Sequence, residues 1–187
     1  LLLMTNINAD GMGKGDLVWF PFHKEISGYQ TKSRLDIGGL KGQLMFTKNV
    51  DTLTTQLRFL GLTVNEDNEL ITLEEMTLDG IFKANLRPLK LVLTLPQFKG
   101  QIKRASLAWD LQSLFFNWNT EKTSNGIELV ELDTRIGHFD FQLEKSSTFS
   151  LDNLVVKNDV EEQEGFVNEN LQVRVGELLL PPAITLG

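Results

Sequence analysis

Two histidines, His23 and His138, are the first residues to consider for metal binding or acid–base catalysis, because the chain has no others. Neither histidine has partners at the spacing of a zinc site, and cysteine is absent. No G-x-S-x-G nucleophile motif occurs. A lone histidine beside apolar residues usually has a structural role, so the sequence predicts no metal site, no cofactor and no catalytic residue.

Adjacent carboxylates are the second group with possible chemistry, at Glu74/Glu75 and Glu161/Glu162. Neighbouring residues of a strand point to opposite faces, so these carboxylates do not converge as the acidic pair of a glycosidase does. We interpret them as solvent-facing charges that discourage edge pairing. The alternative is an enzyme whose acidic residues are dispersed in the sequence and meet only in the fold. Gly13-Lys14 lacks the spacing and the following Ser or Thr of a phosphate loop.

Aromatic residues gather near Trp19 and again near the middle of the chain. The candidate ligand-binding residues belong to the second group and are Trp109, Phe115, Phe116 and Trp118. One interpretation is that they pack in the core. The other is an apolar groove for an acyl chain or a partner strand. The indole N–H groups of the two tryptophans favour partly wet positions.

The elements that position these residues are expected to be β-strands. Residues 71–98 alternate apolar and polar side chains, which is typical of half-buried strands, with a turn expected at Asp79-Gly80. Residues 107–118 also fit one helical face, but their aromatic residues favour a strand. Residues 49–58 are the best helix candidate of the first half, although their threonines favour strand equally. An acidic turn is expected at residues 158–164.

One apolar pattern with a two-residue gap recurs along the chain. Its four copies start at residues 35, 71, 107 and 149. The second copy consists of Ile71, Leu73, Met76 and Leu78, with the gap between Leu73 and Met76. Because a one-residue shift turns every side chain to the other face, the shared gap predicts a bulge or bend in each strand. Met76 and Leu154 are then expected at equivalent buried positions just after the bend. Chance similarity in a chain rich in leucine and valine is the alternative.

These patterns predict a mainly β, antiparallel protein with a curved or elongated sheet of repeated hairpin units and at most a few short helices. The 187 residues form one β-rich domain without an internal linker. Both ends are apolar, which suggests a fragment of a longer protein. No stretch has the roughly 20 apolar residues of a membrane span. Eighteen basic against 25 acidic residues give a net charge of −7, which excludes nucleic acid as an expected partner.

Residues 71–78 (ITLEEMTL), 89–98 (LKLVLTLPQF) and 149–156 (FSLDNLVV), followed by residues 170–180, resemble the YdgA-like family of bacterial envelope proteins of unknown function. The resemblance covers most of residues 35–187 and rests on pattern and length. It implies a β-rich periplasmic protein, anchored to the inner membrane by an N-terminal segment that is not part of this chain. The family assigns no catalytic residues, and none are carried over.

The expected function is therefore a non-enzymatic periplasmic envelope domain that binds a hydrophobic ligand, such as a lipid, or another envelope protein. Elongated β proteins of the envelope often carry lipids along an apolar trough, which is an analogy at the level of the fold. The alternative function is that of a β-rich enzyme with a dispersed acidic site.

Overall fold

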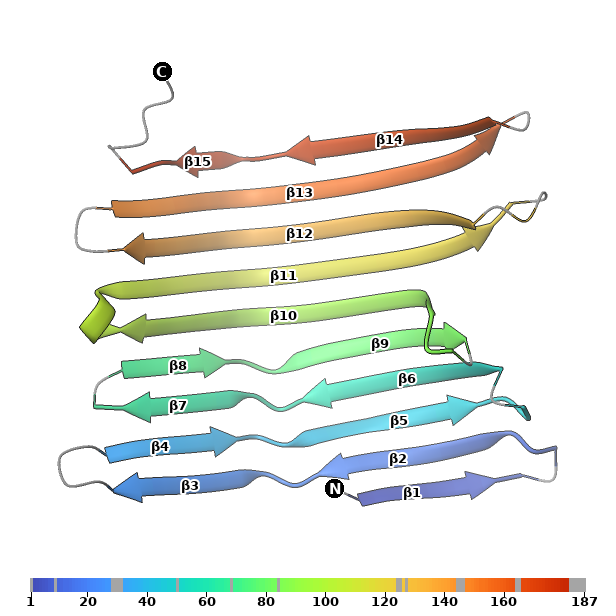
Figure 1. Cartoon of the computed structure of the whole chain (residues 1–187), viewed down its shortest axis with the longest axis horizontal. Coiled ribbons are helices and arrows are strands. Elements are labelled where there is room, and N and C mark those ends of the chain that lie inside the picture. Colours follow the sequence, from blue (N-terminus) through green and yellow to red (C-terminus); the bar gives the residue numbers. More distant parts are fainter. Residues whose placement is uncertain are drawn as a thin grey trace.

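The computed structural model describes residues 2–8, 10–27, 32–49, 51–67, 69–83, 85–123, 126, 128–143, 147–163 and 166–181. They form one open antiparallel sheet (Figure 1). Its strands are β1 (Leu2–Ile7), β2 (Gly13–Trp19), β3 (Phe22–Ser27), β4 (Lys32–Ile37), β5 (Leu40–Phe46), β6 (Thr52–Phe59), β7 (Leu62–Glu66), β8 (Glu69–Leu73), β9 (Met76–Lys83), β10 (Pro88–Ile102), β11 (Leu107–Lys122), β12 (Glu128–Leu143), β13 (Ser147–Gln163), β14 (Phe166–Arg174) and β15 (Glu177–Leu179). A short 3-10 turn, η1 (Lys103–Ala105), joins β10 to β11. The predicted mainly β, antiparallel fold is confirmed.

The strands are arranged in long rows (Figure 1). Five pairs are collinear, namely β2/β3, β4/β5, β6/β7, β8/β9 and β14/β15, and β10 to β13 each span a full row without interruption. This gives nine rows, with β1 added beside β2. Each row pairs with the rows that precede and follow it in the chain. The sheet is therefore a meander of long hairpins, as the spacing of the apolar pattern predicted.

Five rows break between two strands at about the same level, and β11 and β13 each have a left-handed residue at that level, which we call the bend line. Four residues with a left-handed backbone lie on this level, Gly39, Gly61, Ser113 and Asn153, with φ of 94°, 100°, 57° and 52°. Pairing continues on both sides of the line, since Leu95 opposes Leu114 and Gln97 opposes Gln112. The two-residue gaps of the apolar pattern fall on or beside the bend line, so the predicted bend is confirmed.

The sheet is a single layer. Among the described residues, only Leu95 and Leu129 are buried hydrophobic side chains. The chain exposes 12514 Å² of surface, whereas a compact protein of this mass exposes about 9,000 Å². Met76 and Leu154 do follow the bend directly, as predicted, but both are half-buried because no described segment covers their face.

Helix and strand were both left open for residues 49–58, and the structure shows strand β6, whose β-branched threonines fit a pleated sheet. Two local predictions were wrong. The expected turn at Asp79-Gly80 lies inside β9, where Gly80 leaves room for the ring of Phe82. Strand β13 continues to Gln163 through most of the expected acidic turn at residues 158–164. Glu164, at its end, lies outside the described residues, as do Leu1 and residues 182–187 of the apolar ends.

Candidate functional site

The pairing of the strands separates the side chains into an apolar face and a polar face, because directly opposed residues share a face. On each side of the bend line, the residues nearest to the line oppose one another across neighbouring rows. We call such a set of opposed residues a level, and both levels beside the bend line are apolar. One level consists of Phe22, Ile37, Leu62, Leu73, Phe98, Leu111, Phe139, Leu151 and Leu178. The other consists of Trp19, Leu40, Phe59, Met76, Leu95, Leu114, Ile136 and Leu154. We call these two levels the apolar stripe.

The two levels lie on one face. In a regular strand, the three-residue step from Leu151 to Leu154 would move the apolar side chains to the opposite face. The left-handed residue Asn153 takes up one position within this step, as a bulge residue does. One hollow extends across the bend line, where Asp36 and Thr63 line it from one side and Glu75 from the other, together with Leu62 and Leu73 of the stripe.

The apolar stripe crosses all the rows of the sheet. Neighbouring strands lie about 4.8 Å apart, so nine rows span about 38 Å. No residue of the stripe is charged. Its side chains offer aliphatic and aromatic surface with a single N–H donor, the indole of Trp19. Such a surface can bind hydrocarbon, and it supplies no group for acid–base or nucleophilic chemistry.

The four aromatic candidate residues are all half-buried on β11, but they do not share one face. Trp109 lies on the apolar face, opposite Gly100, and its ring centroid is 5.7 Å from that of Phe98. Its ring occupies the space that a side chain at Gly100 would fill. Trp109 therefore packs on the sheet itself, as well as bordering the apolar stripe.

Phe116 and Trp118 lie on the apolar face, opposite Leu93 and Leu91. The indole Nε1 of Trp118 donates to Thr120 Oγ1 at 3.0 Å. Phe115 lies on the polar face, where the guanidinium carbon of Arg135 is 5.5 Å from its ring centroid. The sequence contained the signal for this separation, because Phe115 and Phe116 are adjacent in a strand and must point to opposite faces.

The polar face holds a cluster around His138. Its Nδ1 lies 2.6 Å from Asp152 Oδ1 and its Nε2 lies 2.9 Å from Asp140 Oδ2. The hydrogen bond with Asp152, followed by that with Asp140, raises the pKa of His138 above its usual value. A hydrogen bond from Ser150, together with His138, lowers the pKa of Asp140. Ser150 thus bonds to an aspartate and not to the histidine, which is not the arrangement of an activated nucleophile.

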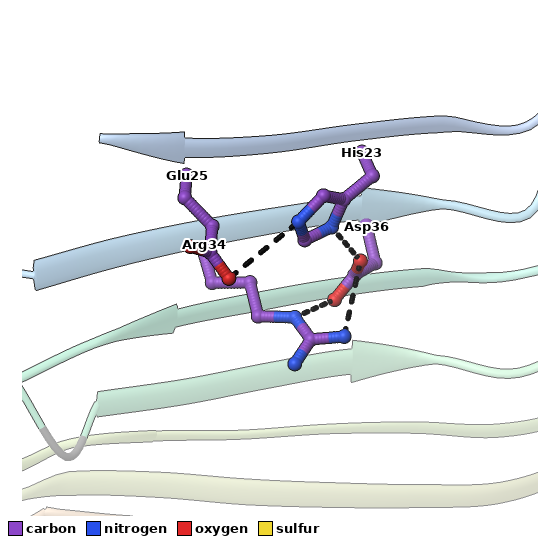
Figure 2. A network of polar contacts seen from close by, with 4 residues as sticks. All are labelled: His23, Glu25, Arg34 and Asp36. Atoms are coloured by element: carbon purple, nitrogen blue, oxygen red, sulfur yellow. Dashed lines mark hydrogen bonds and ion pairs between the residues drawn. The ribbon is translucent and has the colours of Figure 1, made fainter.

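His23 has the same kind of surroundings, as Figure 2 shows. Its Nδ1 is 2.5 Å from Asp36 Oδ1 on the opposite strand, and its Nε2 is 3.6 Å from Glu25. Arg34 Nε lies 2.6 Å from Asp36 Oδ2, and the hydrogen bonds from Arg34 and then His23 lower the pKa of Asp36. Both histidines therefore have an acidic residue two positions further along their own strand and an aspartate opposite.

Sequence reasoning missed these two clusters. The acidic neighbours Glu25 and Asp140, two residues after each histidine, were visible in the sequence. The opposing aspartates Asp36 and Asp152 are 13 and 14 residues away from their histidines, and only the pairing register brings them together. The expectation that a lone histidine has a structural role remains a prediction.

The His138 cluster makes stability depend on pH. A histidine with a raised pKa in the folded state stabilises fully below its unfolded pKa of about 6.5, and this contribution is lost as pH rises through the folded pKa. We expect the free energy of unfolding to fall by roughly 0.2–1 kcal/mol across that window, as for partly exposed ion pairs. Urea titrations at several pH values would measure it. A pH profile unchanged by His138→Gln would contradict the assignment.

Among the described residues, no hollow with the four aromatic candidates in its lining accompanies the apolar stripe. A hollow of 470 Å³, lined in part by Ile7, Met12 and Phe46, lies at the outer ends of β1, β2, β5 and β6 and touches none of the four aromatic candidates. No three metal-ligating side chains gather within the described ranges. The same part of the chain contains no helix long and apolar enough to cross a membrane.

Comparison with known proteins shows a match to a protein family. Over residues 1–184, the sequence matches the family described as a bacterial protein of unknown function (DUF945). This match confirms the predicted relationship to a bacterial family of unknown function. Neither a curated protein nor a solved structure matches the chain.

Proposed function

Since the chain belongs to the DUF945 family of bacterial proteins of unknown function, we propose from the geometry of its sheet that it is a non-enzymatic envelope domain that binds the hydrocarbon chains of lipids along the apolar stripe. One observation carries the proposal: the first apolar level on each side of the bend line runs across the rows, and no described segment covers it. An uncovered apolar surface of this extent is characteristic of a binding surface.

Hydrocarbon fits the chemistry of the stripe better than a polar ligand does. An acyl chain has no hydrogen-bonding groups, so it leaves none unpaired when it is buried against leucine and phenylalanine side chains. Each methylene removed from water contributes about 0.8 kcal/mol. A stripe of about 38 Å offers a long path for an extended chain across the strands.

The ion-paired carboxylates of the described residues favour a structural role over the alternative of a dispersed acidic site. Asp133 is held by Arg135 and Lys157, and Glu69 by Arg104. These contacts lower the pKa of both carboxyls, with the arginine hydrogen bond as the main cause in each case. Carboxylates kept ionised by neighbouring cations are poor general acids at neutral pH.

Placement in the periplasm, with an anchor to the inner membrane outside this chain, is supported by the family resemblance of residues 71–78, 89–98, 149–156 and 170–180. Lipid acyl chains are abundant at that location. Fractionation of cells that produce the complete protein tests the location: recovery with the cytosolic fraction would contradict it.

The binding test uses two adjacent residues on opposite faces of β13. Leu154→Asp places a charge in the apolar stripe, whereas Val155→Asp places it on the polar face, opposite Arg135 and Arg174. We expect Leu154→Asp to weaken binding of a fluorescent fatty acid at least tenfold, which corresponds to about 1.4 kcal/mol. Val155→Asp should bind like the wild type. Equal affinity of both variants, or no binding by the wild type, would overturn the proposal.

Stability of the same variants provides a second measurement. Leu154 is half-buried on an uncovered face, so its replacement by aspartate should cost about 1–2 kcal/mol in the free energy of unfolding, and not the larger cost of an unpaired charge in a closed core. A cost well above this range would show that protein covers the stripe. Mass spectrometry of organic extracts from the purified protein would then identify whether lipid is also present.

A further inference from the structure

A hollow of 630 Å³ lies over the four neighbouring strands β2, β5, β6 and β9 (Figure 1). Its lining includes Lys41, which follows Leu40 of the apolar stripe, and Arg58, which precedes Phe59 of the stripe. Adjacent residues of a strand point to opposite faces, so the hollow lies on the polar face. Its volume is in the range of about 300–1,000 Å³ that is typical of small-molecule sites. Lipid binding along the stripe makes no use of it.

Two cations face each other in this hollow. Lys41 on β5 lies directly opposite Arg58 on β6, and the Cβ atoms of such a pair are about 5 Å apart. Like charges in this position destabilise a sheet. Arg58 Nε donates to Glu75 Oε1, whereas Lys41 has no ion-pair partner among the described residues. The two side chains therefore repel each other, and an anion bound between them would remove that cost.

The next level of the hollow consists of amides and carboxylates. Gln43 lies opposite Gln56 there, and neither side-chain amide has a hydrogen-bond partner in the described part of the chain. The outer two strands add Asp16 and Asp79 to the same level. Two residues of a strand span about 7 Å, so a ligand of that length reaches from the cations to the amides. Amides donate and accept, and carboxylates only accept, so this part of the ligand needs hydroxyl or N–H groups.

The charges of the hollow favour a carboxylate over a phosphate as the anion. Asp16, Glu75 and Asp79 line the hollow together with the two cations. These three carboxylates repel a doubly charged phosphate more strongly than a singly charged carboxylate. Within the described chain, Glu75 takes up only the Nε of Arg58. The terminal N–H groups of the guanidinium can therefore bind both oxygens of a carboxylate, whose planar geometry they match.

We propose that this hollow binds a sugar acid, with the carboxylate of the sugar between Lys41 and Arg58. The hydroxyl groups of the sugar bond to the two glutamine amides and to the flanking aspartates, because hydroxyls both donate and accept hydrogen bonds. The site lies on the opposite face from the apolar stripe, so this proposal does not depend on lipid binding. Its contacts are few and border open solvent, so we expect a dissociation constant in the millimolar range.

An NMR titration with glucuronate at constant ionic strength tests the site directly. The side-chain NH₂ resonances of Gln43 and Gln56 should shift and saturate in the millimolar range. Glucose has the hydroxyl groups without the carboxylate, and acetate has the carboxylate without the hydroxyl groups, so each should bind at least tenfold more weakly. Tighter binding of glucose 6-phosphate than of glucuronate, or equal binding of acetate and glucuronate, would overturn the sugar-acid assignment. So would the absence of saturable shifts at up to about 0.1 M glucuronate.

Lys41→Gln is the matched variant, and Lys90→Gln is its control. Lys41→Gln removes one cation of the pair, so glucuronate should bind at least tenfold more weakly. Without ligand, this variant should be at least as stable as the wild type in urea unfolding, because the repulsion with Arg58 is relieved. Lys90 is exposed on the polar face of β10 but does not line the hollow, so Lys90→Gln should bind glucuronate like the wild type. Unchanged binding by Lys41→Gln, or the same loss in both variants, would overturn the proposal.

Discussion

Replacement of Gly39 by alanine is expected to lower the free energy of unfolding by about 3 kcal/mol or more. Gly39 lies on the bend line between β4 and β5 with φ of +94°, a conformation that residues with a side chain rarely adopt. An added Cβ would lie 2.4 Å from the carbonyl oxygen of Trp19. This neighbour belongs to the backbone, so strand β2 itself would have to move. Denaturant unfolding followed by circular dichroism measures the loss.

Gly126→Ala is the matched control. Gly126 also has a positive φ, of +81°, but nothing lies within 4 Å of an added Cβ. Only the backbone strain then remains, and we expect a cost of about 1 kcal/mol. The difference between the two variants reports the close approach of the rows at the bend line. Equal costs would show that the bend at Gly39 can open without loss.

Truncation of Leu95 to alanine is expected to cost about 2–3 kcal/mol. Leu95 is 7% exposed and lies in the apolar stripe on β10, with rows on both sides. Burial on a single-layer sheet comes from neighbouring side chains of the same face, so this residue reports how well the stripe packs. Thermal and urea unfolding of the variant provide the measurement.

Leu70→Ala provides the comparison, because Leu70 lies on the polar face, opposite Gln101, and is 38% exposed. Its truncation removes less buried apolar surface and should cost under about 1 kcal/mol. If the two truncations cost the same, the apolar stripe would contribute no more to stability than the polar face does.

The bend line was predictable from sequence because it interrupts the alternation of apolar and polar residues along each strand. Alternation of apolar residues identifies a strand, and a shared two-residue gap in that alternation has few explanations other than a local bend. The gap between Leu151 and Leu154 contains Asn153, a residue type that tolerates the left-handed conformation found there. The fold class, the repeated hairpins and the bend line can thus be predicted from the pattern of apolar and polar side chains alone.

The local errors arose where tertiary contacts override turn preference. Asp79-Gly80 has the composition of a tight turn, yet it continues strand β9 because both residues pair with β6 on one side and with β10 on the other. The polar clusters were hidden for a different reason. Asp36 and Asp152 meet the two histidines through strand register, which depends on the lengths of the connections and is not encoded in any short segment.

The order of the rows has a consequence for how the chain folds. Each row contacts only its neighbours in sequence, so contacts close short loops and the contact order is low for an all-β protein. Hairpins can form one after another as the chain leaves the ribosome, each adding to an edge that already exists. Growth by whole rows would also lengthen the apolar stripe by about 4.8 Å per row without any change in the rows already formed.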